Sequence, residues 1–351
     1  MAPNEAKLQA FLARALYDLG AAQSAWLVAL GDRLGIYEAM AGAGPLTPLQ
    51  LAERTGASEA YLREWLANQA CGGYVEYNAR SGTFTLPEEQ ALALARDDSP
   101  ASVAGAFRVA AALAAAQEPL AAAFRTGAGV PREAYGPEVA AGMARASRAH
   151  YGADLLRRWL DAMPGVTGRL LAGASVADLG CGQGAVALAL ARAFPRSRFA
   201  GFDTDAASIA AARRLAEQAG LSGSIRFDAV PARDLPGTGY DLVTAFESFH
   251  EMGDPLAVAR RVRAALAPQG AWLIVEPFAS GRLEDDVGPW GRLVSSMSVL
   301  HCLPTSRSEG EGALGPRAGA AAIAEVVRAA GFGSVRPLPE EPYQILLEAR
   351  P

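Results

Sequence analysis

Lysine, histidine and cysteine are all scarce in this chain of 351 residues. Lysine occurs once, at Lys7, no basic tract is present and the net charge is −5, which argues against strong nucleic-acid binding. The three cysteines, Cys71, Cys181 and Cys302, are far apart and odd in number, which predicts neither a metal motif nor a disulfide framework. No apolar run reaches the ~18 residues of a membrane helix, and Met1–Glu5 does not begin a secretion signal. We therefore expect a cytoplasmic protein without a membrane partner.

Half of the residues are hydrophobic, and the length favours about two domains. Residues 6–43 have helical spacing and predict two or three helices. Thr47-Pro48 then begins a short helix to Arg54, Ser58 precedes a longer one over 59–70, and 74–77 and 83–86 alternate as strands around a turn. Helix, turn, helix and hairpin together are typical of a winged helix. Further helical patterns cover 101–125 and 137–162.

From residue 175 the pattern changes to alternating strands and helices. We predict strands at 175–179, 198–203, 225–228, 240–246 and 271–277, helices at 186–194, 206–219 and 255–266, and a final strand pair at 334–338 and 343–349. This alternation predicts an α/β fold: a Rossmann-like, seven-stranded, doubly wound sheet preceded by the mostly helical winged-helix domain.

A glycine-rich turn, Gly180-Cys-Gly-Gln-Gly184, directly follows the first of these strands. Glycines let the backbone turn tightly and approach a ligand, and the following helix offers free N–H groups. Asp178 lies two residues before the turn. Asp203 ends the next strand, 23 residues after Gly180, where an acid grips ribose hydroxyls in doubly wound folds. The pattern predicts a nucleoside-containing ligand.

Residues 175–277 resemble the class I S-adenosylmethionine-dependent methyltransferases. Val176-Ala-Asp-Leu-Gly-Cys-Gly-Gln-Gly184 is similar to their first motif, Phe202-Asp203 to their acidic second motif, and Tyr240–Phe246 to their fourth, while Leu266–Gly270 is similar to the turn before strand five. Pro231 stands where the family usually has an aspartate, which leaves the backbone N–H of Ala232 for the adenine. The resemblance implies S-adenosylmethionine as cofactor, bound by Asp178, Gly180, Cys181, Gly182, Gly184, Asp203, Thr204, Pro231, Ala232 and Phe246.

The front end, with Tyr61–Leu66 and Gly72–Val75, is similar to a bacterial subgroup of these methyltransferases. In related small-molecule O-methyltransferases the front domain mediates dimerisation and covers the active site. The resemblance therefore implies a homodimer acting on a small-molecule methyl acceptor, in a pathway of secondary metabolism. We divide the chain into a winged-helix dimerisation domain at 1–100, a helical linker or cap at 101–165 and the cofactor-binding domain at 166–351.

The predicted winged helix is poorly suited to DNA. Between Leu46 and Tyr77 two arginines stand against four glutamates, a net charge of −2. Such a surface repels phosphate, whereas a recognition helix presents basic residues to the groove. We therefore expect DNA binding to be absent.

His250 follows the strand that ends near Phe246, and ligands of doubly wound sheets bind beyond the carboxyl ends of the strands. In the related O-methyltransferases a histidine here is the general base that takes the acceptor's hydroxyl proton. The alternative role for His250 is to cap the following helix.

A second hypothesis adds His301, on the segment between the fifth strand and the last helix. Two imidazoles and a carboxylate, from His250, Glu251 and His301, can hold a divalent iron or zinc ion, with Asp254 as a substitute for Glu251. This set is similar to that of metal-dependent methyltransferases that methylate the carbon beside the ketone of 2-oxo acids. The metal there polarises the keto acid and stabilises its enolate.

Three further residues are candidates for the acceptor site: Arg125 for a carboxylate, and His150 and Met297 as pocket walls. The other hypotheses are a non-enzymatic regulator that binds S-adenosylmethionine and a protein or RNA methyltransferase, the acidic balance arguing against RNA. The sequence leaves open whether oxygen, carbon or nitrogen is methylated and whether a metal is bound.

Overall fold

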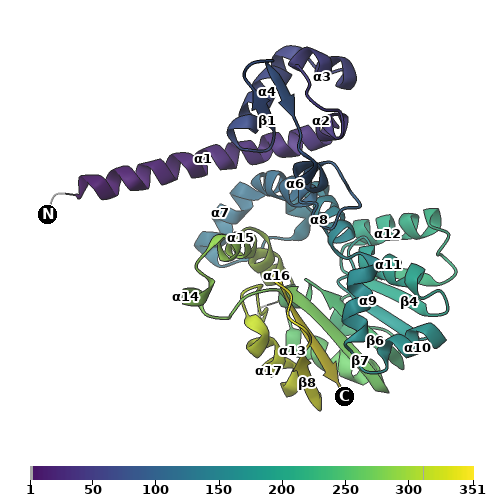
Figure 1. The fold of residues 1–351 in the computed structure, drawn as a ribbon. Helices are drawn as coiled ribbons and strands as arrows, with labels where there is room; N and C mark the ends of the chain where they lie inside the picture. The colour runs from purple at the N-terminus through teal and green to yellow at the C-terminus, as the bar shows by residue number, and fades with distance from the viewer. Residues whose placement is uncertain (1–2, 311) are drawn as a thin grey trace. The chain divides into compact units, whose positions relative to one another are not determined.

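The computed structural model describes residues 3–310 and 312–351. By their internal contacts the residues form two compact units (Figure 1). Unit 1 contains Met1–Ala114 and Ala141–His150, and unit 2 contains Ala115–Ala140 and Tyr151–Pro351. The stretch that we assign to a helical linker, 101–165, contributes to both. No helix within the described residues is long and apolar enough to cross a membrane.

Unit 1 begins with a long helix, α1, whose N-cap Asn4 accepts a hydrogen bond from the Lys7 N–H. Thr47 and Gln50 form a capping box at α3, as Thr47-Pro48 predicts. The unit's elements are α1 (Glu5–Arg33), α2 (Ile36–Met40), α3 (Pro48–Thr55), α4 (Glu59–Cys71), β1 (Glu76–Asn78), β2 (Thr83–Thr85), α5 (Glu88–Leu94) and α6 (Ala104–Ala112). Strands β1 and β2 pair antiparallel, which completes the winged helix after α3 and α4.

The helical stretches around residues 101–162 are more broken than predicted. A 3-10 turn, η1 (Leu113–Ala116), separates α6 from α7 (Gln117–Thr126), and Pro119 explains this break because it lacks the N–H that would continue the α-helical ladder. Beyond the 3-10 turn η2 (Arg132–Tyr135), α8 (Pro137–His150) and α9 (Ala153–Asp161) are separated at Tyr151-Gly152.

Unit 2 contains the predicted seven-stranded sheet, in the order β5-β4-β3-β6-β7-β9-β8. The first five strands are parallel, and the final pair closes the sheet antiparallel. The strands are β3 (Ser175–Leu179), β4 (Arg198–Asp203), β5 (Ile225–Ala229), β6 (Tyr240–Phe246), β7 (Leu266–Pro277), β8 (Ser334–Pro337) and β9 (Gln344–Arg350). Residues 266–270, expected to be a turn, belong to β7, whose register shifts where it meets β6 between Tyr240 and Leu242.

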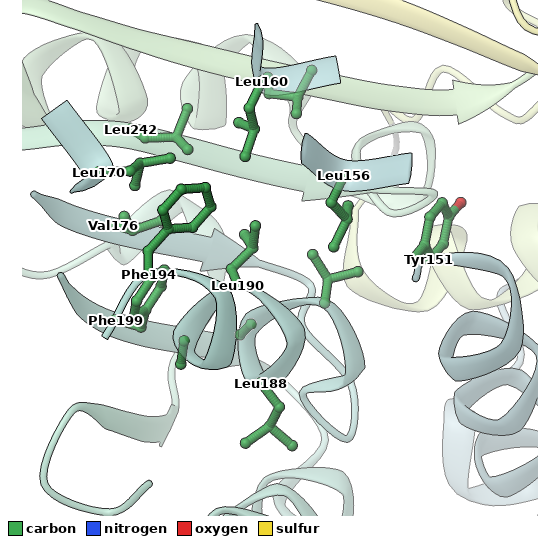
Figure 2. Close-up of a cluster of buried hydrophobic side chains, with 14 of the residues drawn as sticks. Tyr151, Leu156, Leu160, Leu170, Val176, Leu188, Leu190, Phe194, Phe199 and Leu242 are labelled. Carbon is green, nitrogen blue, oxygen red and sulfur yellow. The ribbon is translucent and has the colours of Figure 1, made fainter. Parts of the chain in front are cut away.

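Helices cover both faces of this sheet because its strands alternate side chains between two apolar cores. One core joins Val176, Phe199 and Leu242 to α9, α10 (Val166–Ala172) and α11 (Ala185–Ala193), and Figure 2 shows Leu190 of α11 and Phe194, which follows this helix, beside these strand residues. The other core joins Ala177, Val243 and Ile274 to α13 (Pro255–Ala265) and α17 (Gly319–Ala329). The remaining helices are α12 (Ala206–Gln218), η3 (Ala232–Asp234), η4 (Phe249–Glu251), α14 (Leu283–Asp286), α15 (Pro289–Met297), η5 (Ser298–Cys302) and α16 (Leu303–Glu309).

Candidate active site

The glycine turn between β3 and α11 has the backbone shape that only glycine adopts readily. Gly180, Gly182 and Gly184 all have positive φ, at 64°, 50° and 79°. A Cβ on Gly180 would lie 2.4 Å from the Cβ of Ser248, and one on Gly184 would lie 2.5 Å from the Phe227 ring. A Cβ on Gly182 would meet nothing within 4 Å. The middle of the turn therefore faces open space while its two ends are packed.

Two aspartates flank the turn. Asp178 is buried and accepts a 2.7 Å hydrogen bond from the Thr244 hydroxyl. Burial raises the pKa of Asp178 to about 7, against the Thr244 bond and with the help of the Asp203 charge. Asp203 accepts from the Gly182 N–H at 2.8 Å and from the Asp205 N–H at 2.9 Å, so it fixes the turn itself. Burial raises the pKa of Asp203, and these bonds and Arg132 oppose the rise.

A pocket opens beside the turn. Five residues predicted to bind the cofactor line it: Gly180, Asp203, Thr204, Pro231 and Ala232. Its other walls are Arg132, Phe202, Arg233, Ser248, Glu251, Met252, Gly253, Asp254, Val258 and Glu309.

Cofactor roles for the other predicted residues stay predictions. Phe246 stacks on Trp159 and meets Tyr151 edge-on in the core. Burial raises the pKa of the Cys181 thiol well above its ordinary value, so Cys181 keeps its proton as a small packing residue. Two of them, Gly182 and Gly184, form the turn itself, and Asp178 lies in β3 just before it.

His250 lies on η4, directly beyond the carboxyl end of β6, and is buried. Its Nδ1 is hydrogen-bonded to the Glu276 carboxylate at the end of β7. The other Glu276 oxygen accepts from the backbone N–H of Phe249 at 2.8 Å and of His250 at 3.3 Å. Ser248, two residues earlier, donates to the Leu179 carbonyl at 2.9 Å, which fixes this segment beside the glycine turn. The helix cap is Asp254, not His250, because the Asp254 carboxylate accepts from the Ala257 N–H.

The electrostatics of His250 depend on its carboxylate neighbours. Burial by itself lowers the pKa of His250, but the Glu276 charge, with Cys302 and Glu251, outweighs burial and places it well above its ordinary value. The Nε2 atom is buried without a hydrogen-bond partner. In its neutral form the imidazole donates from Nδ1 to Glu276 and presents the Nε2 lone pair to an incoming group.

Glu251 lies between His250, His301 and Arg132. Its Oε1 lies 3.7 Å from His250 Nε2 and 3.3 Å from His301 Nδ1, so the structure brings together His250, Glu251 and His301 as predicted. Its Oε2 is bound by Arg132 at 2.9 Å. Burial alone would raise the pKa of Glu251, but Arg132 and the two histidines hold it well below its ordinary value. Glu251 is therefore an ionised carboxylate, held in place by Arg132 and His301.

A strap formed by residues 127–135 lies against α16 and carries Arg132 into the site. Val130 N–H donates to the Pro304 carbonyl at 2.9 Å, and Arg307 donates to the Gly127 carbonyl at 3.1 Å. Arg132 also reaches Glu309 at 3.4 Å. At the end of this strap the Tyr135 ring packs on the His301 ring, with centroids 4.9 Å apart.

None of the predicted acceptor residues is among those that line the pocket. Arg125 is exposed near the end of α7, and Met297 is half-buried at the end of α15, just before the His301 segment. His150 ends α8 in unit 1, whereas the site belongs to unit 2. Their roles stay predictions.

Sequence reasoning missed Glu276, Arg132 and Tyr135 and gave Cys302 no partner. Glu276 had a usable signal, since it ends a strand next to the strand that precedes His250. The strap residues Arg132 and Tyr135 had none, because they lie in a loop without hydrophobic periodicity, more than a hundred positions from the residues they contact.

Residues 170–309 match the methyltransferase domain family, and residues 22–96 match the Rv2258c-like winged HTH domain. The chain therefore contains a methyltransferase domain preceded by a winged-helix domain. It is 33% identical over 107 residues to the ubiquinone biosynthesis O-methyltransferase of Psychrobacter arcticus, covering 30% of this chain and 41% of that one. The chain spans about two fifths of the length of the curated relatives it matches.

Solved methyltransferases share the fold over the full chain. The mitomycin 7-O-methyltransferase superimposes with a TM-score of 0.72 at 21% identity, covering 99% of this chain and 100% of that chain. Human N-acetylserotonin methyltransferase in complex with S-adenosylmethionine gives a TM-score of 0.70 at 18% identity, covering 99% and 98%. The pocket of this methyltransferase fits S-adenosylmethionine, because Asp203 at the end of β4 and Gly180 of the glycine turn border one cavity.

Proposed function

We propose that this methyltransferase transfers a methyl group to a hydroxyl oxygen of a small molecule, with His250 as general base. The observation that carries the proposal is the buried His250–Glu276 pair, which orients a free Nε2 beside the glycine turn. The O-methyltransferase names of the relatives and of the structural neighbours support the same reaction class.

When bound, S-adenosylmethionine supplies a methyl group on a positively charged sulfur. Asp203 and the glycine turn would hold its ribose, and Ala232 would meet its adenine. His250 Nε2 would accept the acceptor's hydroxyl proton as the oxygen–methyl bond forms and the methyl–sulfur bond breaks, leaving the sulfur neutral. Glu276 and Glu251 would then stabilise the imidazolium.

Metal-assisted methylation of a 2-oxo acid has less support. The sequence led us to expect His250, Glu251 and His301 as ligands of iron or zinc, but the comparisons give this reaction no support. Glu251 Oε2 is bound by Arg132, and Glu251 Oε1 lies within hydrogen-bond distance of His301. The O-methyl route needs no ion.

The test is methyl transfer from labelled S-adenosylmethionine to a panel of small phenols and alcohols, with a chelator present throughout. We expect a methylated hydroxyl product, and a fall in kcat of about 10²–10⁴-fold for His250→Ala, the usual contribution of a general base. S-adenosylhomocysteine binding by calorimetry should survive this substitution. Binding without transfer to any acceptor would favour the regulator hypothesis, and no binding would remove the enzyme hypothesis.

We also propose that the protein is a homodimer formed through unit 1. Helix α1 exposes Leu8, Leu12, Leu16, Leu19, Trp26 and Leu30, which recur at spacings of three, four and seven residues. Such a stripe of large apolar side chains is the pattern by which a helix packs on a partner. The dimerisation role of the front domain in related O-methyltransferases supports a second copy of this chain as that partner.

A further inference from the structure

Three side chains of different chemistry point their ligand atoms at one spot in unit 2. His250, Glu251 and Cys302 are all buried, and one nitrogen, one oxygen and one sulfur atom from them lie within 4.8 Å of one another. Cys302 reaches the cluster from the single π-helical turn η5, a local widening that is frequent at functional sites. The sequence prediction paired His250 and Glu251 with His301, and the structure places the neighbouring Cys302 in the cluster with them.

The histidine of this cluster is arranged as metal-binding histidines are. Its Nδ1 is held by the Glu276 carboxylate, and its buried Nε2 makes no hydrogen bond. In metal sites a carboxylate commonly fixes the histidine in this way, which selects the tautomer and strengthens the other nitrogen as a ligand.

We propose that His250 Nε2, Glu251 Oε1 and Cys302 Sγ form an inhibitory site for a thiophilic divalent ion such as Zn²⁺. Zinc favours nitrogen, oxygen and sulfur donors in tetrahedral geometry, with bonds of about 2.0 Å to nitrogen or oxygen and about 2.3 Å to sulfur. Binding releases the Cys302 thiol proton, so that a thiolate and a carboxylate balance the charge of the ion. Glu251 lines the pocket, which gives the ion a path from solvent.

The neighbours of Glu251 are compatible with this site. Arg132 binds Oε2 at 2.9 Å and leaves Oε1 to the ion. His301 Nδ1, 3.3 Å from Oε1, orients the carboxylate without itself being a ligand. The fourth coordination position is left for water.

The inhibitory effect of the ion rests on the proposed function of His250 as general base. An ion on Nε2 occupies the lone pair with which His250 would accept the acceptor's proton. Zinc would therefore inhibit methyl transfer, whereas the metal-assisted route would require a metal for activity.

The test is titration of the full-length protein with Cd²⁺, a probe whose thiolate complexes absorb in the ultraviolet, followed by competition with Zn²⁺. We expect one equivalent of Cd²⁺ and a thiolate charge-transfer band that is lost in Cys302→Ser and kept in Cys71→Ser, the exposed-cysteine control. His301→Asn should keep the band. Glu251→Gln provides a second ligand variant and should weaken Cd²⁺ binding at least tenfold.

The absence of a band in the wild-type protein, or a band that survives in correctly folded Cys302→Ser, overturns the site. These measurements need no acceptor, so they are independent of the methyl-transfer assay. Zinc inhibition is then measured against each variant's own zinc-free rate. Inhibition that persists unchanged in Cys302→Ser would likewise exclude this site.

Discussion

At the scale of single residues, Glu276 decides which nitrogen of His250 can act. Its Oε1 accepts two backbone N–H groups, from Phe249 and His250, and its Oε2 faces His250 Nδ1. In Glu276→Gln the N–H groups of Phe249 and His250 need an acceptor, so the amide oxygen takes the place of Oε1. The amide NH₂ then takes the place of Oε2 and faces His250 Nδ1. Nδ1 must then accept, and the imidazole proton moves to Nε2.

We therefore expect Glu276→Gln to lower kcat by about 10²–10⁴-fold, as loss of general-base catalysis does. The Glu276 charge is also the main influence that raises the pKa of His250. A protonated imidazole cannot accept a proton, so wild-type kcat/KM should fall as pH falls through this raised pKa. The residual activity of the variant should have its acidic limb at lower pH.

The measurement is a pH profile of kcat/KM, with Glu348→Gln as control. Glu348 is an equally buried carboxylate in the same sheet, paired with Arg336 and Arg350 away from the site. The Glu348→Gln variant should be less stable than the wild type but keep the wild-type pH profile of kcat/KM. Wild-type kcat in Glu276→Gln would contradict the role of His250 as base.

Asp203 supports a second prediction at this scale. Its carboxylate borders the pocket and also accepts the Gly182 N–H, so it holds the glycine turn while facing the ligand. Asp203→Asn should raise the Kd of S-adenosylhomocysteine about 10- to 100-fold, equivalent to the ~1.5–3 kcal/mol of a hydrogen bond to a charged group. Calorimetry checks this.

Asp205→Asn is the matched control. Asp205 caps α12 by accepting from Ala207 and Ser208, and asparagine caps helices as well as aspartate does. The Kd of S-adenosylhomocysteine for Asp205→Asn should stay at the wild-type value. Equal affinities for both variants would show that Asp203 is not a cofactor ligand.

The sequence could predict those residues that follow strands of a parallel sheet. Gly180, Asp203 and His250 lie at or just beyond the ends of β3, β4 and β6, and the carboxyl ends of these parallel strands meet at one edge. The partner of His250 was missed although Glu276 stands near the end of a neighbouring strand, because the sequence does not say which side chain a carboxylate there will pair with. The placement of Cys302 instead of His301 against His250 depends on the π-helical turn, which shifts side-chain directions and has no sequence signal.

At the scale of elements, the strap of residues 127–135 determines whether Arg132 reaches the site. Gly129 is the point of closest approach to α16, because a Cβ there would lie 2.1 Å from the Ser308 nitrogen and 2.5 Å from the Arg307 carbonyl carbon. These are backbone atoms, which cannot move aside as a flexible side chain can. The strap must lift if a methyl group is added.

Gly129→Ala should therefore lower the free energy of unfolding by about 1–3 kcal/mol, as overpacking does. It should also lower kcat/KM, because Arg132 would leave Glu251. Gly168→Ala is the control, since Gly168 lies within α10 with nothing within 4 Å of its Cβ position, and alanine stabilises a helix interior by roughly 0.5–1 kcal/mol. Chemical denaturation and steady-state kinetics measure both effects. Unchanged stability and kinetics in Gly129→Ala would refute this docking.

Elements with a periodic pattern were predictable, and the strap was not. Strands β3, β4 and β6 have the predicted bounds, because alternating and buried apolar runs are strong signals. The strap's position depends on tertiary contacts, such as the hydrogen bond from Val130 to Pro304, between segments far apart in the chain. No local propensity encodes such contacts.

At the scale of the whole molecule, the large apolar side chains that α1 exposes are the feature that the structure of a single chain leaves unexplained. Phe11, Leu16 and Tyr17 are 67%, 69% and 74% exposed, which is unusual for large apolar side chains gathered on one helix. The double substitution Phe11→Glu with Leu16→Glu puts two like charges there while keeping good helix formers. If a second copy covers the stripe, these charges are desolvated on association and the dimer dissociates.

We expect sedimentation velocity to give a dimer for the wild-type chain and a monomer for the double variant, with the helical circular dichroism unchanged. Arg14→Gln is the control, because Arg14 lies on the same helix but pairs with Asp18 in solvent, and it should remain dimeric. A monomeric wild-type protein at assay concentration would exclude the homodimer. A double variant that still dimerises would place the interface elsewhere, because two buried, unpaired carboxylates cost more than the contacts around them can restore.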